Sequence, residues 1–215
     1  MTWQPSKPFV NRIGVFFGVG FVLFQVGCAA IFGWDIHAPG MLSENFSKAV
    51  PLVHERVALY LPEDSLAYTS QDRGGRTADP QTYHVGEAFG PMLVEGFQQA
   101  FDEFIFLETA PTEAILKRYA IPYLVSVEIK DFRNRVTWKA HAVSMVTETV
   151  VFDSNLRRLG RFEATGTSDA EKVFSKKGGP EVNLNAALEN NVSAIIQYLQ
   201  DSMRTGTWEK ERASE

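Results

Sequence analysis

Apolar and polar residues along this 215-residue chain follow two periodicities, one typical of strands and one typical of helices. Alternation with a period of two predicts strands over residues 54–61, 123–132, 136–152 and 159–167. Apolar residues at spacings of three and four predict helices over 85–104 and from Asn183 to about residue 205, with Asn183 as N-cap. A short strand over 105–107 and a helical turn or two over 111–119 complete the set.

The order of these elements is strand, helix, strand, short helix, three strands and helix. Strands that follow one another directly, with helices grouped at the ends, predict an α+β domain. We expect a mostly antiparallel sheet of about five strands, with the two main helices packed on one face. The apolar stripe of the last helix is formed by Leu184, Leu188, Val192, Ile195, Ile196, Leu199 and Met203.

Several positions depart from these patterns. Residues 63–83 read as a long polar loop. Pro91 lies inside the first predicted helix, which either kinks there or begins near Gly90. The alternation within 136–152 slips, so we expect a bulge or bend near Thr147.

The amino terminus carries the one long apolar run that is free of charge. Lys7 and Arg12 precede it, residues 13–24 are apolar or glycine, and Cys28 follows Val26-Gly27. A basic start, an apolar stretch and small residues before a cleavage site are the parts of a bacterial export signal. The same residues could instead form an uncleaved membrane anchor, because 13–34 is long enough to cross a bilayer, or a signal for soluble secretion.

The segment around Cys28 resembles the lipobox of bacterial lipoproteins, although Gln25 stands where that pattern prefers leucine. The resemblance implies that Cys28 is lipidated and becomes the first residue of the mature chain. Lipidation also accounts for a lone cysteine, which outside the cytoplasm is otherwise a reactive thiol. We therefore expect a membrane-anchored protein whose domain lies in the bacterial periplasm, more readily at the outer than at the inner membrane.

The chain divides into a signal peptide or anchor (1–27), a tether (28–52), an α+β domain (53–205) and a polar tail (206–215). A hydrophobic fraction of 45% is enough for one packed core. The net charge of -5 argues against nucleic acid as a partner. With one cysteine the domain has no internal disulfide and depends on packing.

Three stretches resemble small bacterial envelope lipoproteins of the outer-membrane assembly and transport-auxiliary type. They are Val57-Ala58-Leu59-Tyr60-Leu61-Pro62, Tyr83-His84-Val85-Gly86-Glu87-Ala88, and the strand pair around Val150-Val151-Phe152-Asp153 that returns through Gly166 to the last helix. The resemblance implies an envelope location and a domain in which two helices pack on a sheet. It implies no particular pathway.

No enzyme or metal motif is present in the sequence. The four histidines (His37, His54, His84 and His141) have no metal-binding spacing, and no Gly-x-Ser-x-Gly or phosphate-binding loop occurs. We expect His84 and Glu87 to cap a helix, His54 to lie at the surface and His141 to lie on a sheet face. We expect no cofactor and no catalytic or metal site. The hypothesis of an enzyme of unrecognised type is the least favoured.

Two groups of residues are candidates for contact with other molecules. The first is cationic and spans an expected turn at Asn134: Lys130, Arg133, Arg135 and Lys139. It could attract anionic headgroups or an acidic partner, or it could be a solvated hairpin end. A second basic group (Arg157, Arg158 and Arg161) surrounds the next hairpin and could lie at the opposite end of the sheet. The other candidate is an apolar set on the outer sheet face, Leu124, Trp138 and Tyr60.

The favoured function is a non-catalytic envelope lipoprotein that binds a partner in an outer-membrane assembly or transport complex. The alternative is a lipid- or glycolipid-handling component that holds an acyl chain between helix and sheet. A deep apolar cavity beneath the helix over 85–104 would favour lipid handling, and a filled core would favour partner binding.

Overall fold

The structure is a computed structural model that describes residues 34–72, 80–136, 141–168 and 179–208. Its elements are β1 (Trp34–Ile36), α2 (Glu44–Ala49), β2 (Val53–Tyr60), α3 (Glu63–Leu66), β3 (Ser70–Asp72), β4 (Gln81–Tyr83), α4 (Val85–Ala100), β5 (Phe101–Leu107), α5 (Glu113–Arg118), β6 (Tyr123–Val136), β7 (His141–Phe152), β8 (Arg158–Thr167) and α6 (Pro180–Thr205). Cys28 and Lys139 lie outside the described residues.

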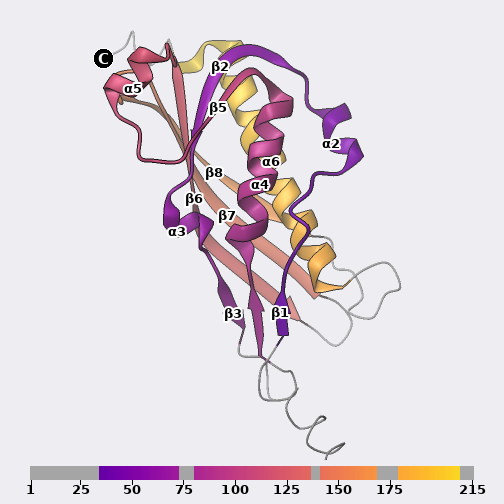
Figure 1. Ribbon diagram of the computed structural model, residues 1–215. Coiled ribbons are helices and arrows are strands. Elements are labelled where there is room, and N and C mark those ends of the chain that lie inside the picture. The colour runs from indigo at the N-terminus through magenta and orange to yellow at the C-terminus, as the bar shows by residue number, and fades with distance from the viewer. Residues whose placement is uncertain (1–33, 73–79, 137–140, 169–178, 209–215) are drawn as a thin grey trace, which may run out of the picture.

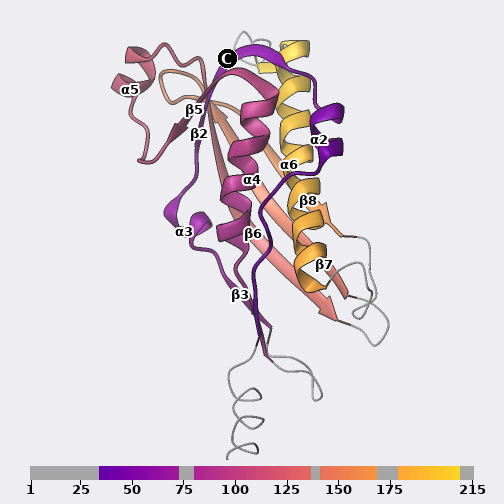
Figure 2. The same ribbon diagram turned by 45° about the vertical axis from the view of Figure 1, so that its right-hand side comes forward.

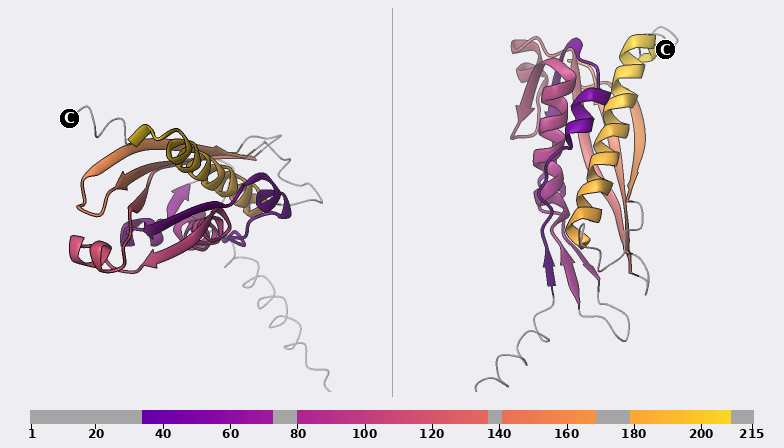
Figure 3. Two further views of the ribbon diagram at one scale, coloured as in Figure 1. Left: turned by 90° about the horizontal axis from the view of Figure 1, so that it is seen from above. Right: turned by 90° about the vertical axis from the view of Figure 1, so that its right-hand side faces the viewer.

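A five-stranded sheet forms the centre of the domain, with strand order β5-β2-β6-β7-β8. β2 runs parallel to both of its neighbours, whereas β6, β7 and β8 follow one another antiparallel. α4 and α6 lie side by side in front of the sheet (Figures 1 and 2), and their apolar faces share one core with it. Seen from above, the twisted sheet curves around the two helices (Figure 3). The predicted α+β class, with two helices on one face of a sheet of five strands, is confirmed. The sheet is mixed rather than mostly antiparallel, because two of its four strand pairs are parallel.

A second, smaller sheet was not expected from the sequence. It has the order β1-β4-β3, with β1 parallel and β3 antiparallel to β4. The prediction of a loop over 63–83 is therefore wrong, because α3, β3 and β4 lie within it. Strands of three residues are too short to show a period, which explains the error.

The small sheet projects from one end of the domain, away from α5 and from the C-terminal end of α6 (Figures 1 and 3). The stretch expected to be a tether supplies β1 and α2, and it buries Ile36, Phe46 and Val50 in the core. From Trp34 onward this stretch is therefore folded onto the domain.

α4 ends four residues before the predicted helix end at residue 104. Phe101 and Phe104 belong to β5, where they pair with Val53 and Val57 of β2. Phenylalanines at helical spacing continue the period of α4, so the sequence alone did not mark the boundary. Both rings still pack on Phe97, with centroid distances of 5.4 and 5.8 Å. The helix runs unbroken through Pro91, which cannot donate a hydrogen bond to the carbonyl of the preceding turn.

The irregularity expected near Thr147 lies on the partner strand. The register passes from Ile129↔Thr147 to Asp131↔Val146, so Lys130 is the extra residue and β6 carries the bulge. β7 itself alternates without interruption between buried and half-buried residues. Its alternation looked broken because two buried positions are threonines.

The terminal helix packs on the sheet as predicted, against β7 and β8, and its stripe from Leu184 to Leu199 is buried. Asn191, at the centre of this face, accepts a hydrogen bond from the Thr147 hydroxyl at 2.9 Å. Its amide donates to the carbonyl oxygens of Met145 and Ala164. α6 ends at Gly206, whose φ of 61° is left-handed, and the tail beyond it buries Trp208.

Candidate functional site

The end of the domain that carries the small sheet brings together several features singled out in the sequence. We call it the small-sheet end; it comprises β1, β3, β4, the last residues of β6 and the first turn of α4. Asn134 joins β6 to the small sheet, because its amide donates to Asp72 Oδ2 at 3.3 Å and to Gln81 Oε1 at 3.4 Å. The expectation of a turn at Asn134 is therefore wrong: β6 continues to Val136.

A buried chain of hydrogen bonds fixes this end to the rest of the fold. The Tyr83 hydroxyl donates to Gln81 Oε1 at 2.7 Å, and His141 Nε2 lies 3.1 Å from the Tyr83 oxygen. Asn183 Nδ2 lies 3.0 Å from His141 Nδ1. Because tyrosine has one hydroxyl proton, a neutral imidazole that donates through Nε2 and accepts at Nδ1 satisfies every member.

Burial favours that neutral form. It lowers the pKa of His141, although the negative charge of Glu181 acts in the opposite direction. Burial also raises the pKa of Tyr83 far above its usual range, with the charges of Asp72 and Glu181 adding to the effect. Both side chains are almost fully buried, so this network holds β4, β7 and α6 together and offers no group to a substrate.

The four cationic residues predicted as a contact surface have different surroundings. Lys130 Nζ contacts Glu128 at 2.7 Å and Glu148 at 3.2 Å. Arg133 is 80% exposed and pairs with Asp131 at 2.7 Å. Arg135 is exposed and has no ion pair among the described residues. Arg133 and Arg135 thus present charge at the small-sheet end, whereas Lys130 is held within a network of ion pairs.

That network lies on the outer face of the sheet, the face away from α4 and α6. Glu128, Glu148 and Glu163 are direct neighbours across β6, β7 and β8. Like charges in register are destabilising unless cations separate them. Lys130 contacts the first two glutamates, and Arg161 pairs with Glu148.

The ion pairs shift both partners toward their charged forms. Hydrogen bonds to Glu128 and then to Glu148 raise the pKa of Lys130. Burial alone would raise the pKa of Glu148, but the hydrogen bonds and charges of Lys130 and Arg161 outweigh it and hold that pKa below its usual value.

Two members of the second basic group, Arg157 and Arg158, lie at the other end of the sheet from Arg133 and Arg135. Arg158 is in register with Phe152, at the hairpin between β7 and β8, while Arg135 is in register with Ala142. Arg157 pairs with Asp153 at 2.9 Å. Arg157 and Arg158 are therefore separated from Arg133 and Arg135, whereas Arg161 and Lys130 meet at Glu148 on the outer face of the sheet.

The apolar set expected on the outer face is not exposed as a group. Leu124 is buried beneath α5, where it packs with Ala58, Leu116 and Ile121, and Tyr60 lies beside this cluster. Trp138 lies outside the described residues. The short helix α5 covers this part of the sheet, which the sequence pattern did not reveal.

The histidines meet in a way that their spacing did not predict. His37, His84 and Glu87 bring their ligand atoms within 4.8 Å of one another at the small-sheet end. His84 occupies the N-cap position of α4 but makes no capping hydrogen bond with its side chain, so the capping expectation is wrong. His54 is a surface residue, as expected, and contacts Asp102 at 3.0 Å. Asp102, which falls within the helix predicted over 85–104, lies on β5.

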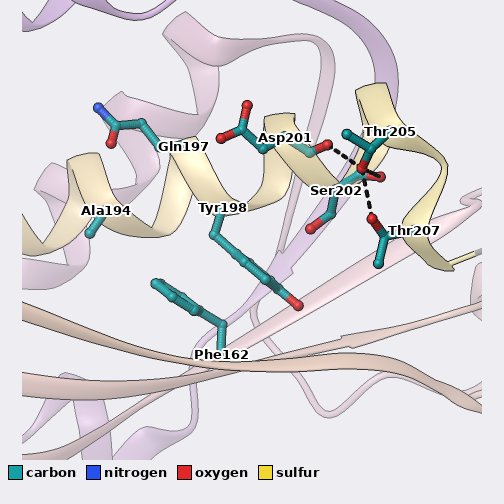
Figure 4. Close-up of a pocket in the computed structure, with 8 residues that line it drawn as sticks. All are labelled: Phe162, Ala194, Gln197, Tyr198, Asp201, Ser202, Thr205 and Thr207. Carbon is teal, nitrogen blue, oxygen red and sulfur yellow. Dashed lines mark hydrogen bonds between the residues drawn. The ribbon is translucent and has the colours of Figure 1, made fainter.

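Three cavities lined by described residues lie along α6, away from the small-sheet end. One of about 370 Å³ lies between α6 and β8 (Figure 4). The ring of Tyr198 stacks on Phe162 at its floor, with centroids 4.3 Å apart, and the Thr205 hydroxyl closes one side through Thr207 at 2.7 Å. A cavity of about 360 Å³ continues around Tyr198 toward Arg158 and Trp208, and one of about 380 Å³ lies between Leu52 and Met203.

The interface between α4 and the sheet is filled by side chains. Phe89, Met92, Leu93 and Phe97 of α4 are at most 1% exposed and share one cluster with Val125 and Val127 of β6. Gly96 lets α6 approach closely, because a methyl group there would collide with Val192. No described helix is both long and apolar enough to cross a bilayer.

Comparisons with known proteins give weak likenesses. No protein-family model matches the chain, and no curated protein matches it. Among solved structures, the lipoprotein GNA1162 of Neisseria meningitidis is 9% identical, with a TM-score of 0.35 over 68% of this chain and 99% of its own. A PelC dodecamer of Paraburkholderia phytofirmans is 15% identical, with a TM-score of 0.34 over 67% and 92%. The hypothetical protein CT253 of Chlamydia trachomatis is 9% identical, with a TM-score of 0.34 over 54% and 74%. These neighbours are bacterial proteins and include a lipoprotein.

Proposed function

We propose that this chain is a non-catalytic envelope lipoprotein, anchored through Cys28, whose domain binds a partner in an outer-membrane assembly or transport complex. The anchor and the domain are joined at the small-sheet end. The proposal rests on one observation above all, namely that the first described strand, β1, is built into the small sheet.

In this proposal the position of β1 supports an orientation in which the small-sheet end lies nearest the membrane. It begins at Trp34, six residues after Cys28, and a chain of that length spans at most about 20 Å. A lipid on Cys28 therefore keeps the small-sheet end within about 20 Å of its attachment point. Trp34 itself is 62% exposed, and tryptophan favours the interface between lipid and water.

Arg133 and Arg135 lie at the same end of the domain. Their charges would face anionic headgroups, or the acidic surface of a partner beside the membrane. Salt screens this attraction over a Debye length of about 8 Å at physiological ionic strength. The attraction is therefore effective only if β1 holds the small-sheet end close to the membrane.

The packing beneath α4 supports partner binding over lipid handling. An acyl chain held between helix and sheet requires an apolar cavity there, and side chains of the core occupy that interface. The cavities along α6 are lined in part by charged and hydroxyl groups, among them Asp201, Ser202 and Arg204.

The proposal is tested with the full-length chain and a matched pair of charge reversals. Arg133→Glu with Arg135→Glu changes charge at the small-sheet end, and Arg118→Glu with Arg158→Glu makes the same change at the far end. At low ionic strength we expect the first variant to lose the preference for anionic over zwitterionic vesicles. It should also recover less partner when envelopes are solubilised in detergent and the chain is pulled down.

The far-end variant should behave as the parent in the vesicle assay, and both should melt near the parent because exposed charges contribute little to stability. If the parent and the small-sheet-end variant bind anionic vesicles equally, then Arg133 and Arg135 are solvated side chains that contact no membrane. Copurification of no envelope protein with the parent chain would contradict the partner-binding role.

A further inference from the structure

Two parallel strands of the small sheet end in histidine at the same level. Ile36 of β1 is in register with Tyr83 of β4, and the next residues are His37 and His84. The backbone N–H of His84 donates to the Ile36 carbonyl at 3.1 Å, so the strands are still paired at this point. The two imidazoles stack, with centroids 4.1 Å apart and planes 10° from parallel.

Glu87 adds a carboxylate to the pair. It follows His84 by three residues, one turn into α4, and its Oε2 lies 3.1 Å from His37 Nδ1 and 3.8 Å from His84 Nδ1. Ligand atoms around a tetrahedral zinc ion, at bond lengths of about 2.1 Å, lie about 3.4 Å from one another. The two distances bracket that value.

Asp35 gives the cluster a supporting carboxylate. Its Oδ1 lies 3.5 Å from His84 Nε2, the ring nitrogen that points away from Glu87. A histidine that binds a metal usually donates its other N–H to such a group, which fixes the tautomer with a free lone pair on the binding nitrogen. In this arrangement His84 Nδ1 is the nitrogen left to bind a metal.

We propose that His37, His84 and Glu87 form a divalent transition-metal site, best suited to Zn²⁺, with Asp35 as the positioning residue for His84. Imidazole nitrogens select zinc and its neighbours over Mg²⁺ and Ca²⁺, which prefer oxygen ligands alone. Three protein ligands leave a fourth position for water or for a group from a partner.

Binding requires a local rearrangement that the surroundings permit. An ion held by both rings must lie in the plane of each, so the imidazoles turn out of their stack when they bind it. The side chains of His37, His84 and Glu87 are 52%, 28% and 66% exposed, which leaves room for rotation about their side-chain bonds.

The site would act as a clip between the anchor and the domain. β1 has only three residues, so its pairing with β4 contributes little to the stability of the docked state. A metal that joins His37, just after β1, to His84 and Glu87 on α4 would bind only when β1 is docked, and it would stabilise that state by mass action. Zinc binding stands apart from the proposed function, because it requires neither a lipid on Cys28 nor a partner, whereas the role as a clip for the anchor rests on the proposed function.

The test measures Zn²⁺ binding to the full-length chain in detergent, by competition with a chromogenic chelator, together with thermal melting in EDTA and in Zn²⁺. For the parent we expect one tight site and a rise of roughly 5–10 °C in Tm when free zinc is about a hundred times Kd. Three variants remove one ligand each: His37→Ala, His84→Ala and Glu87→Gln. Each should melt like the parent in EDTA, but should lose both the tight binding of Zn²⁺ and the rise in Tm that Zn²⁺ causes. Asp35→Asn should weaken binding about 10- to 100-fold.

His54→Ala is the matched control, because His54 is also an exposed histidine beside a carboxylate but has no second histidine near it. It should keep the affinity of the parent. In addition, Co²⁺ bound to the parent should give the visible absorption of a tetrahedral site. No zinc binding by the parent below millimolar concentration, undiminished binding by His37→Ala with His84→Ala, or an equal loss in His54→Ala would each overturn the proposal.

Discussion

Leu199 and Ile195 lie on the buried face of α6, and shortening either to alanine tests whether this helix holds the fold together. Both side chains are 0% exposed within the main core. Each substitution deletes three buried carbons, and the loss of their burial lowers the free energy of unfolding by about 2.4 kcal/mol, at about 0.8 kcal/mol each. The cavity that remains brings the expected loss in the free energy of unfolding to roughly 2–5 kcal/mol.

For a domain of this size each kcal/mol lowers Tm by about 2–4 °C, so we expect a drop of roughly 4–20 °C. Circular dichroism of the full-length chain in detergent measures it. Val182→Ala is the control on the same helix, because Val182 is 45% exposed and its truncation should change stability by less than about 0.5 kcal/mol. If Ile195→Ala and Leu199→Ala both melt with the parent, α6 does not pack on the sheet as described.

Two further predictions concern packing and protonation. Gly166→Ala should lower the free energy of unfolding by about 1–3 kcal/mol or more, because the new methyl group would collide with the backbone carbonyl of Ala187. Gly179→Ala is the control, because its methyl group meets only the flexible end of the Glu181 side chain. Thermal melts of the two variants compare them directly. The lowered pKa of His141 means that the folded state binds fewer protons than the unfolded state, so its contribution to stability is complete above about pH 6.5 and is lost as pH falls below that value. The parent should therefore lose more Tm between pH 7.5 and 5.5 than His141→Gln, and equal losses would exclude His141 as a cause.

The periodic elements could be predicted from the sequence because long elements repeat their pattern. The stripe of α6 and the alternation of β6 and β8 each extend over ten residues or more, so all three elements were recognised. Their ends were predicted less well: β6 continues past residue 132 to Val136, and α6 begins at Pro180, with Gly179 rather than Asn183 at the N-cap. The small sheet could not be predicted, since β1, β3 and β4 have three residues each and β1 pairs with a strand that is distant in the chain. The boundary at Phe101 was missed because its spacing suits both a helix and a strand.

The candidate site could be predicted only in part, because it too depends on contacts between segments that are distant in the chain. Arg133 and Arg135 stand out by charge in an otherwise acidic chain. Their nearness to the small sheet, and so to β1, depends on the hydrogen bonds that Asn134 makes with Asp72 and Gln81. The cluster of His37, His84 and Glu87 had a local signal in the spacing of His84 and Glu87, but the third member depends on the pairing of β1 with β4.

The central claim is that Cys28 anchors this chain to a membrane by a lipid. The direct test is the intact mass of the protein purified from membranes, together with the location of Cys28→Ser. The account predicts a mature chain that begins at an acylated Cys28, and a Cys28→Ser variant that is released from the membrane or left unprocessed. An unmodified chain that begins at Met1 and stays on the membrane when Cys28 is replaced would contradict the account and leave the apolar segment as an uncleaved anchor.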